Sequence, residues 1–421
     1  MTANLSEQVE NLLDKYENPI PSVAYLLCDR HERDKVALCY ESGDGKKRAY
    51  TYGELHELSG KFAGSLRDLG VSKGQRVAIL LPKGPELLIS VLAVWRLGAV
   101  HVPLFTAFGP QAVSYRVENS GACVIITDSK NRPKLNGTET NAGLTKLVDG
   151  RIITVEPQNE NSDDISFWSV LEEADPVTEN VSVSGDDLFI LLYTSGTTGH
   201  PKGVEVPVRA LAAFEAYMRF GLDLRPDDVF WNIADPGWAY GLYYGLVGPL
   251  LLGQTFIMFN APFSVEETYR VMKEYLVTNY AAAPTVYRSM RAKGMPEGLQ
   301  KELHLRVLSS AGEPLNPDVS TWAESQFGVP IYDHYGQTEQ GMVVNNHHYP
   351  ALLCPVKTGS MGQSMPGFRA VIVDSNGASC RQVLKGNSRL TQIILHYIGS
   401  VATTRTVNVR GNGSQLDPVT A

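Results

Sequence analysis

Short apolar strands alternate with helices along most of this 421-residue chain, and this alternation restricts the fold more than any other feature of the sequence. The stretch RVAILLP at residues 76–82 predicts a strand, and a helix is expected over residues 86–98. AVHVPL at residues 99–104 predicts the next strand. Strands separated by helices in this way indicate βαβ units, so we expect an α/β fold with mostly parallel sheets.

The chain is too long for one ordinary core, so we expect two subdomains. A helix is predicted at residues 51–69, because Thr51 and Glu54 have capping-box spacing and Gly70 follows the apolar pattern. The polar segment 131–185 is expected to be irregular and to join the two halves. Further helices are predicted near 109–119, 240–252, 264–276 and 316–327, and further strands at 123–128, 188–193, 228–233, 254–259, 279–283, 305–310 and 329–336.

The stretch YTSGTTGHPKGV at residues 193–204 directly follows an apolar strand. Glycines let a backbone approach a ligand closely, and successive N–H groups can then bind anionic oxygens. Hydroxyl groups and Lys202 add donors and positive charge, which favours a polyphosphate ligand over the alternative of a solvated turn. Lys202 is followed by Gly203 and no helix begins there, so this is not a P-loop of the GxxxxGK[ST] type, and we expect a hairpin.

Several further motifs occur in a fixed order over residues 20–377, and together they resemble the adenylate-forming superfamily of acyl-CoA synthetases, nonribosomal adenylation domains and luciferase-like enzymes. The resemblance implies the fold of that family's large N-terminal domain, with two α/β subdomains and a small β region. The motifs that carry it, besides the loop, are RLGAVHVPL (96–104), ADPGWAYGLYYGLVGPLLLG (234–253), SSAGEPLNP (309–317), YDHYGQTEQG (332–341) and GSMGQSMPGFRAVIVD (359–374).

The resemblance also implies roles for individual residues. The residues implied to bind the β- and γ-phosphates of ATP are Thr194, Ser195, Gly196, Thr197, Thr198, Gly199 and Lys202. Those implied to line the adenine are Gly312, Glu313 and Pro314 on one side, and Asp333, His334, Tyr335, Gly336 and Gln337 on the other. Thr338 would bind the α-phosphate and Glu339 would hold Mg²⁺, so Lys202, Thr338 and Glu339 are the candidate catalytic residues.

The acyl group would be bound by Trp238, Tyr240, Gly241 and Gly336, and coenzyme A would be the acceptor. In acetyl-specific members of the family a tryptophan occupies the place of Gly336, so its absence here implies a medium-length or bulkier acid. Simpler readings exist for these residues: Glu339 as a surface carboxylate and Trp238 as part of the core. His334 lies within the adenine motif, and the adjacent pair His347 and His348 has no third ligand at suitable spacing. No zinc site is therefore expected.

Composition narrows the possible partners. The 37 basic and 45 acidic residues give a net charge of -8, which argues against nucleic acid or an anionic membrane as the main partner. The five cysteines are scattered, which fits a reducing compartment. No signal peptide or membrane span is recognisable, so a cytoplasmic location is expected, while the sequence does not indicate an oligomeric state.

The resemblance ends shortly after residue 377. The family's T-G-D motif, hinge and C-terminal lid domain, which supplies a lysine for adenylation, are not recognisable, and we expect the lid to be absent through a truncation or a change of reading frame. The expected division is 1–185, 186–378 and an atypical tail at 379–421. The sequence thus predicts an acyl-CoA synthetase by ancestry with impaired turnover. The alternatives are a non-catalytic nucleotide- or acyl-binding protein, or an adenylating enzyme with an acceptor other than coenzyme A.

Overall fold

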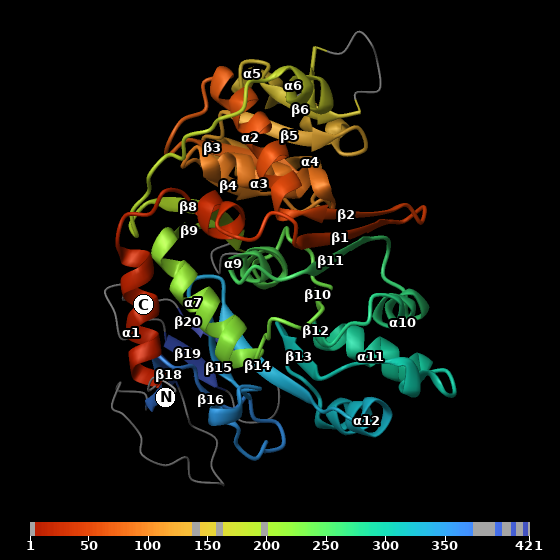
Figure 1. The fold of residues 1–421 in the computed structure, drawn as a ribbon. Coiled ribbons are helices and arrows are strands. Elements are labelled where there is room, and N and C mark those ends of the chain that lie inside the picture. Colours follow the sequence, from red (N-terminus) through yellow and green to blue (C-terminus); the bar gives the residue numbers. More distant parts are fainter. Residues whose placement is uncertain are drawn as a thin grey trace.

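The computed structural model describes residues 5–136, 144–156, 163–194, 201–373, 392–397, 406–409 and 416–419. These residues form helices around three β-sheets of seven, nine and four strands (Figure 1). The four-stranded sheet is antiparallel and consists of β17 (Phe368–Val373), β18 (Gln392–Tyr397), β19 (Thr406–Val409) and β20 (Leu416–Val419). The expected architecture of two α/β regions with a small β region is therefore confirmed.

The seven-stranded sheet lies in the upper half of Figure 1 and has the strand order β7-β6-β5-β3-β4-β8-β9. Its strands are β3 (Arg76–Leu80), β4 (Val100–Pro103), β5 (Val124–Asp128), β6 (Ile152–Val155), β7 (Ile165–Ser166), β8 (Leu188–Thr194) and β9 (Lys202–Pro207). Its helices are α2 (Tyr52–Asp68), α3 (Pro85–Arg96), α4 (Pro110–Ser120), α5 (Leu144–Leu147) and α6 (Phe167–Glu173). All neighbouring strands are parallel except β9, which runs antiparallel to β8.

The nine-stranded sheet has the order β16-β15-β14-β13-β12-β10-β11-β1-β2, and it is parallel from β14 to β1. Its strands are β1 (Val36–Ser42), β2 (Lys47–Thr51), β10 (Phe230–Asn232), β11 (Phe256–Asn260), β12 (Asn279–Ala282), β13 (Val307–Ala311), β14 (Ile331–Gln337), β15 (Gly341–Asn345) and β16 (Gln363–Ser364). The helical elements of this part are α7 (Leu211–Ala216), η4 (Tyr217–Gly221), α8 (Ala239–Gly241), η5 (Leu242–Val247), α9 (Gly248–Leu251), α10 (Val265–Glu274), α11 (Pro284–Lys293) and α12 (Pro317–Phe327).

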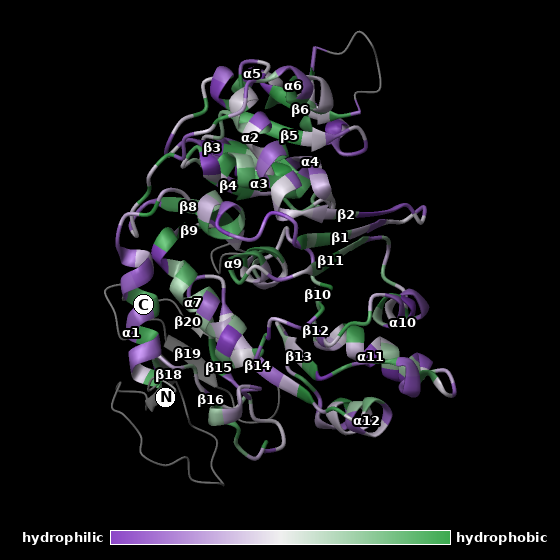
Figure 2. Cartoon of the chain, viewed as in Figure 1, coloured by the Kyte–Doolittle hydropathy of each residue, from purple (hydrophilic) through white to green (hydrophobic). Residues whose placement is uncertain are grey.

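The parallel strands are buried almost throughout. All residues of β4 and β13 are buried, including the polar residues His101, Ser309 and Ser310, so neither strand shows the alternation of a sheet with one solvent-exposed face. Figure 2 shows hydrophobic residues concentrated along strands such as β5 and β8. No helix within the described ranges has both the length and the apolar character that a membrane crossing requires.

Most of the predicted elements are confirmed, and α2 begins with the expected capping box of Thr51 and Glu54. The prediction that residues 131–185 are irregular is wrong in part, because α5, β6, β7 and α6 form there and two of these elements extend the sheet. The strands β1 and β2 lie within the expected first division, 1–185, yet they extend the nine-stranded sheet. The strands β8 and β9 follow residue 185 and complete the seven-stranded sheet, so the division at that residue stays a prediction.

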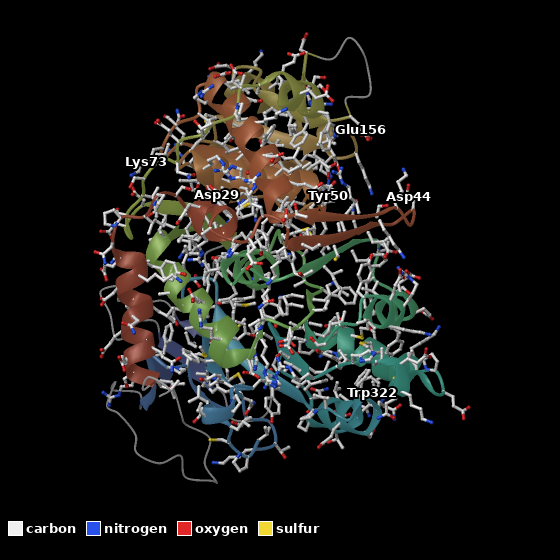
Figure 3. All side chains as sticks on the ribbon, viewed as in Figure 1. Asp29, Asp44, Tyr50, Lys73, Glu156 and Trp322 are labelled. Atoms are coloured by element: carbon white, nitrogen blue, oxygen red, sulfur yellow. The ribbon has the colours of Figure 1, made fainter. Side chains whose placement is uncertain are left out.

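A buried ion pair connects the first part of the chain to the helices of the seven-stranded sheet. Asp29, labelled in Figure 3, ends the π-helical turn η1 (Tyr25–Asp29) and accepts two hydrogen bonds of 2.7 Å from Arg96 at the end of α3. His56 and Asn180 add contacts to the same carboxylate at 2.8 and 3.3 Å. Burial is the largest single influence and would raise the pKa of Asp29, but the hydrogen bonds and charges of Arg96 and His56 together keep this pKa below its ordinary value.

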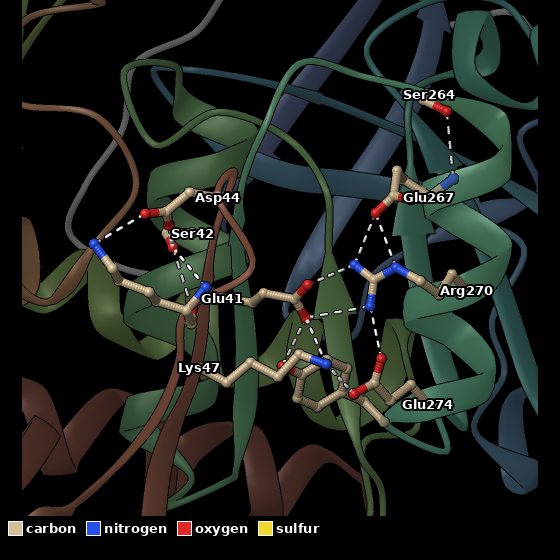
Figure 4. Close-up of polar contacts among 10 residues, drawn as sticks. Glu41, Ser42, Asp44, Lys47, Ser264, Glu267, Arg270 and Glu274 are labelled. Atoms are coloured by element: carbon tan, nitrogen blue, oxygen red, sulfur yellow. Dashed lines mark hydrogen bonds and ion pairs between the residues drawn. The ribbon is translucent and has the colours of Figure 1, made fainter.

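A second polar cluster attaches the β1–β2 hairpin to α10 (Figure 4). The carboxylate of Glu41 on β1 is buried, and it accepts hydrogen bonds from Arg270 at 2.6 Å and from the Tyr275 hydroxyl at 2.9 Å. Lys47 on β2 lies 3.7 Å from Glu41 and also pairs with Glu274. Two cations and a hydroxyl group thus compensate one buried carboxylate, and they fix the β1–β2 hairpin, at the edge of the nine-stranded sheet, to α10.

The buried imidazole of His101 on β4 makes stability depend on pH. Both ring nitrogens are buried without a hydrogen-bond partner among the described residues, and burial lowers the pKa of His101 to about 3. In the unfolded chain the His101 imidazole binds a proton near pH 6.5. The contribution of neutral His101 to the free energy of unfolding is therefore complete above pH 6.5 and is lost as the pH falls from 6.5 through 3. We expect His101→Phe to reduce the loss of unfolding free energy between pH 7.5 and 5 by about 2 kcal/mol.

Urea denaturation of both proteins at the two pH values measures this difference. His31, His334, His347 and His348 also have lowered pKa values because they are buried, so the variant should keep part of the pH dependence. If the free energy of unfolding changes equally with pH in the wild type and in His101→Phe, His101 does not contribute to the pH dependence of stability.

Candidate functional site

The candidate residues lie in the second half of β14, in the turn that follows it, and beyond the carboxyl ends of β8, β10 and β13. The strands β10, β13 and β14 are parallel members of the same sheet, so their carboxyl ends open at one edge. Ligands of open α/β sheets bind at such edges, because the loops there are free to carry polar groups. The residues that the sequence motifs predicted therefore lie at the edge of the sheet where ligands of this fold class bind.

The expected phosphate loop connects β8 to β9, and both of its ends are described. Thr194 ends β8 opposite Lys202, which begins β9, so the expected hairpin is confirmed. The side chain of Lys202 is exposed, and the Tyr115 hydroxyl on α4 donates a 3.1 Å hydrogen bond to the carbonyl of Pro201. The predicted ligands Ser195, Gly196, Thr197, Thr198 and Gly199 lie outside the described residues.

Asp333 on β14 has an unused hydrogen-bond acceptor. Its Oδ1 atom is buried without a hydrogen-bond partner among the described residues, and its Oδ2 atom accepts a long 3.5 Å contact from the Leu315 amide. Burial raises the pKa of Asp333 to about 7. A buried acceptor without a partner fits a site that receives a donor from a ligand, such as the amino group of adenine.

The loop after β13 is exposed next to this carboxylate. Gly312 has a φ of +98°, which favours glycine, and a Cβ atom there would contact nothing within 4 Å. The Glu313 side chain instead accepts hydrogen bonds from Thr285 and Arg288 on α11, and the Arg288 bond lowers the pKa of Glu313. Glu313 is therefore positioned to hold the loop, and Gly312 and Pro314 remain exposed.

The other adenine candidates on β14 divide between its two faces. His334 is buried, with its ring nitrogens 2.7 Å from the Tyr217 hydroxyl and 2.9 Å from the Asn346 carbonyl. His334 therefore lies on the face of β14 that packs against Tyr217 of η4. Gln337 donates a 3.1 Å hydrogen bond to the Tyr335 hydroxyl, and its buried Oε1 atom has no partner within the described ranges.

Thr338 and Glu339 lie in the turn between β14 and β15. The Thr338 carbonyl accepts a 3.2 Å hydrogen bond from Tyr243, which fixes the turn to η5. Burial raises the pKa of Tyr335 to about 12, and the negative charge of Glu339 acts in the same direction. The described residues contain no cluster of three or more side chains that could hold a metal ion.

Aromatic side chains form a wall next to the turn after β10. Trp238 is 42% exposed, and its ring packs against Phe105 and Phe108, with ring centroids 5.3 and 5.6 Å apart. The alternative of a core role for Trp238 therefore does not fit. The backbone of the same turn is tightly folded, because a Cβ atom at Gly241 would lie 2.1 Å from the Asp235 carbonyl oxygen.

Gly336 permits close pairing of β14 and β15. A Cβ atom at this position would lie 2.3 Å from the Gly341 carbonyl oxygen and 2.7 Å from the Met342 sulfur. The Tyr244 hydroxyl accepts a 2.9 Å hydrogen bond from the Met342 amide behind the same hairpin. Any side chain at position 336 would therefore displace its neighbours, and the proposed effect of Gly336 on acyl size stays a prediction.

Sequence reasoning missed Lys83 and Asp235. Lys83 follows β3, and its buried ammonium group donates a 2.6 Å hydrogen bond to the Ile233 carbonyl at the end of β10. Burial raises the pKa of Asp235, which accepts a 2.7 Å hydrogen bond from the Gly237 amide within the Trp238 turn. The available signals were that Lys83 directly follows a predicted strand and that Asp235 lies within the motif at residues 234–253.

A series of contacts connects the candidate residues across the two sheets. Arg116 on α4 contacts Tyr193 before the phosphate loop and Phe108 in the aromatic wall. Phe108 packs against Trp238, and the helical segment after Trp238 reaches the Thr338 turn through Tyr243. The structure thus links the loop ends, the aromatic wall and the β14–β15 turn.

Known proteins resemble the part of the chain that contains these candidate residues. A profile of the AMP-binding enzyme family matches residues 27–387. The acetyl-coenzyme A synthetase of Bacillus subtilis (strain 168) is 34% identical over 375 residues, which cover 87% of this chain and 64% of the relative. The acetyl-coenzyme A synthetase of Methanothrix thermoacetophila is 33% identical, with 87% of this chain and 59% of the relative covered. The chain thus spans about three fifths of the length of these curated relatives.

Solved structures give the same picture of the fold. An acyl-CoA synthetase of Brucella canis superposes with a TM-score of 0.83 at 39% identity and covers 97% of this chain and 76% of its own. A benzoate CoA ligase of Burkholderia xenovorans LB400 has a TM-score of 0.74 at 22% identity, covering 93% of this chain and 78% of its own. The second likeness concerns the fold alone.

Proposed function

The chain belongs to the AMP-binding enzyme family, and we propose that it uses ATP to activate a carboxylic acid as an acyl adenylate, which is then transferred to coenzyme A. The observation that carries this proposal is the unpartnered Oδ1 of Asp333 beside the exposed Gly312 loop, because it offers an acceptor for the adenine amino group. The similarity to acetyl-coenzyme A and acyl-CoA synthetases supports the reaction class.

The proposed chemistry proceeds in two displacements. A carboxylate oxygen of the acid attacks the α-phosphorus of ATP, the bond to the bridging oxygen breaks, and pyrophosphate leaves. The thiol of coenzyme A then loses its proton and attacks the activated carbonyl, and AMP leaves. Lys202, the Thr338 hydroxyl and backbone donors would stabilise the negative charge that develops in the first step.

Magnesium is the metal that this chemistry implies. Mg²⁺ is usually bound through one or two carboxylates together with substrate phosphates, which fits a single protein ligand at Glu339. Its role when bound would be to neutralise phosphate charge. The described residues supply no competing cage of three side chains.

The phosphate loop is tested by nucleotide binding. We expect Lys202→Ala to weaken MgATP binding to the 421-residue chain about 10-fold, because one charge-assisted contact to phosphate is lost. Isothermal titration calorimetry of both proteins measures this change. Lys301→Ala, which removes an exposed lysine in a different part of the chain, serves as the matched control and should bind like the wild type.

Two outcomes would count against the proposal in different ways. Equal affinity of the wild type and Lys202→Ala would remove Lys202 from the phosphate site. Absence of any MgATP binding by the folded wild type would contradict the proposed function itself. Detection of an acyl adenylate by mass spectrometry, after incubation with ATP and a series of acids, would support the first displacement directly.

The size of the acid is a finer proposal. We infer a medium-length or bulkier acyl group, because Trp238, Phe105 and Phe108 present an apolar wall. Each buried methylene contributes about 0.8 kcal/mol, so hexanoate should bind at least about 10-fold more tightly than acetate in the presence of ATP. Competition binding with acetate, butyrate, hexanoate, octanoate and benzoate measures this preference.

The variant Trp238→Ala should reduce the preference for longer acids. Trp322 on α12 provides the matched control, because Trp322→Ala removes an indole from the lower right of the molecule (Figure 3). Equal affinity for acetate and hexanoate in the wild type would contradict the proposed acyl size. It would leave the activation chemistry unaffected.

A further inference from the structure

Lys83 connects the seven-stranded sheet to the nine-stranded sheet. It lies three residues after β3, and its ammonium group donates a 2.6 Å hydrogen bond to the carbonyl of Ile233, directly after β10. Burial lowers the pKa of Lys83, whereas the negative charge of Asp235 acts in the opposite direction. Shielding a charge from water is costly, so the contacts of this ammonium group have to compensate for that cost.

The Ile233 carbonyl lies at the start of the turn that carries Trp238. Within this turn the Asp235 carboxylate accepts a 2.7 Å hydrogen bond from the Gly237 amide, and the Asp235 carbonyl accepts one of 3.1 Å from the Trp238 amide. A Cβ atom at Gly237 would lie 2.7 Å from the Cα atom of Phe105, which follows β4. The turn is therefore packed directly against the seven-stranded part, and a shift of its first residue would be transmitted to the indole.

Two kinds of contact thus position the indole of Trp238. Its ring packs against Phe105 and Phe108, and the backbone that carries it is held at Ile233 by the hydrogen bond from Lys83. The cavity beside Lys83 measures about 10 Å³, which is room for about one water molecule and not for an acyl chain. Lys83 would therefore act on a bound acid through the turn rather than by touching the acid.

We propose that Lys83 is a positioning residue that holds the Trp238 turn and thereby sets the preference for longer acids. Its hydrogen bond keeps the end of β10 at a fixed place relative to the end of β3, so that the indole stays in the apolar wall. This inference rests on the proposed function, since it assumes that the acid binds against Trp238. The hold on the turn itself follows from the geometry and can be measured without any ligand.

The first measurement concerns the position of Trp238. The full chain is compared with Lys83→Met, which keeps an unbranched side chain without the ammonium group, and with Lys83→Arg, which keeps a charged donor. Acrylamide quenching of fluorescence, measured with and without an added Trp238→Phe change, isolates the signal of Trp238 among the five tryptophans. We expect the quenching constant of Trp238 to rise about 2-fold in Lys83→Met, because the turn is held less firmly, and to stay near the wild-type value in Lys83→Arg.

The second measurement is competition binding of acids in the presence of ATP. Lys83→Met should reduce the preference for hexanoate over acetate from at least about 10-fold to below about 3-fold, because a displaced indole no longer covers the longer chain. Lys83→Arg should retain most of this preference. Affinity for MgATP should change by less than about 2-fold in both variants, since Lys83 acts on the turn that carries Trp238.

Lys73→Met provides the matched control. Lys73 also donates a hydrogen bond to a backbone carbonyl, that of Ser182 at 3.0 Å, and it pairs with Asp187 at 2.9 Å. These partners lie outside the Trp238 turn. The control variant should leave both the quenching of Trp238 and the acid preference unchanged.

The outcomes separate a positioning role from a general loss of structure. Unchanged quenching of Trp238 in Lys83→Met would overturn the inference, as would an unchanged acid preference. Equal weakening of MgATP and hexanoate, or loss of the preference in Lys83→Arg, would also overturn it. Should Lys83→Met not fold, as judged by circular dichroism, Lys83→Gln replaces it and the same criteria apply.

Failure of the inference and failure of the proposed function are distinguishable. A folded wild type that binds no MgATP would contradict the proposed function, and the quenching comparison would still decide whether Lys83 holds the turn. A wild type that binds MgATP and prefers hexanoate, with Lys83→Met equal to it in both measurements, would overturn only the role of Lys83.

Discussion

Replacing Asp29 with alanine is expected to lower the free energy of unfolding by about 3 to 5 kcal/mol. The change leaves the guanidinium of Arg96, which is 1% exposed, without its charged partner. Both 2.7 Å hydrogen bonds are lost, and His56 and Asn180 lose an acceptor at the same time. Urea denaturation at pH 7.5, followed by circular dichroism, measures the effect.

Two further variants make this result interpretable. Asp68→Ala removes one partner of the exposed Arg67–Asp68 pair and should change stability by less than about 0.5 kcal/mol. The double variant Asp29→Ala with Arg96→Met should recover part of the loss, because no buried charge then remains unpaired. A loss below about 1 kcal/mol for Asp29→Ala alone would show that water reaches Arg96.

Glu339→Gln is expected to remove most of the effect of magnesium on ATP binding. The variant keeps the size of the side chain but loses the negative charge that would bind the ion. In the wild type, affinity for ATP in excess Mg²⁺ should exceed affinity in the presence of a chelator, and the variant should lose about 10- to 100-fold in the magnesium condition. Calorimetric titration under both conditions measures the difference.

The control for this prediction is Glu173→Gln, which neutralises an exposed carboxylate at the end of α6. It should bind ATP like the wild type with and without Mg²⁺. If Glu339→Gln and the wild type respond equally to magnesium, Glu339 is not the metal ligand. The simpler reading of a surface carboxylate would then be favoured.

The fold was predictable where local signals agreed with the packing. The helix α2 carries a capping box, an apolar face and a terminal glycine, and it forms as expected. The strand β6 was missed because only four residues, Ile152–Val155, form it within a polar segment. The pairing of β1 with β11 depends on residues more than 200 positions apart, such as Leu38 and Phe256, and local patterns do not encode such contacts.

The candidate site was predictable as a set of motifs but not as a set of contacts. Asp333 was named from its motif, while its unpartnered oxygen and raised pKa follow from burial that only the folded chain creates. Lys83 reaches the Ile233 carbonyl across 150 positions of sequence, a contact that no local pattern encodes. Glu313 was named from the SSAGEPLNP motif as an adenine-lining residue, yet Arg288 on α11 holds its side chain.

The N-terminal strands β1 and β2 belong to the nine-stranded sheet, whose other strands are much later in the sequence, and this arrangement affects folding during synthesis. The strand β1 emerges from the ribosome early, but its parallel partner β11 is synthesised more than 200 residues later. At typical rates of about 5 to 20 residues per second, β1 waits roughly 10 to 40 s for that partner. During this interval the edge of β1 that later pairs with β11 has no partner strand, which makes it a target for chaperones and a risk for misassociation.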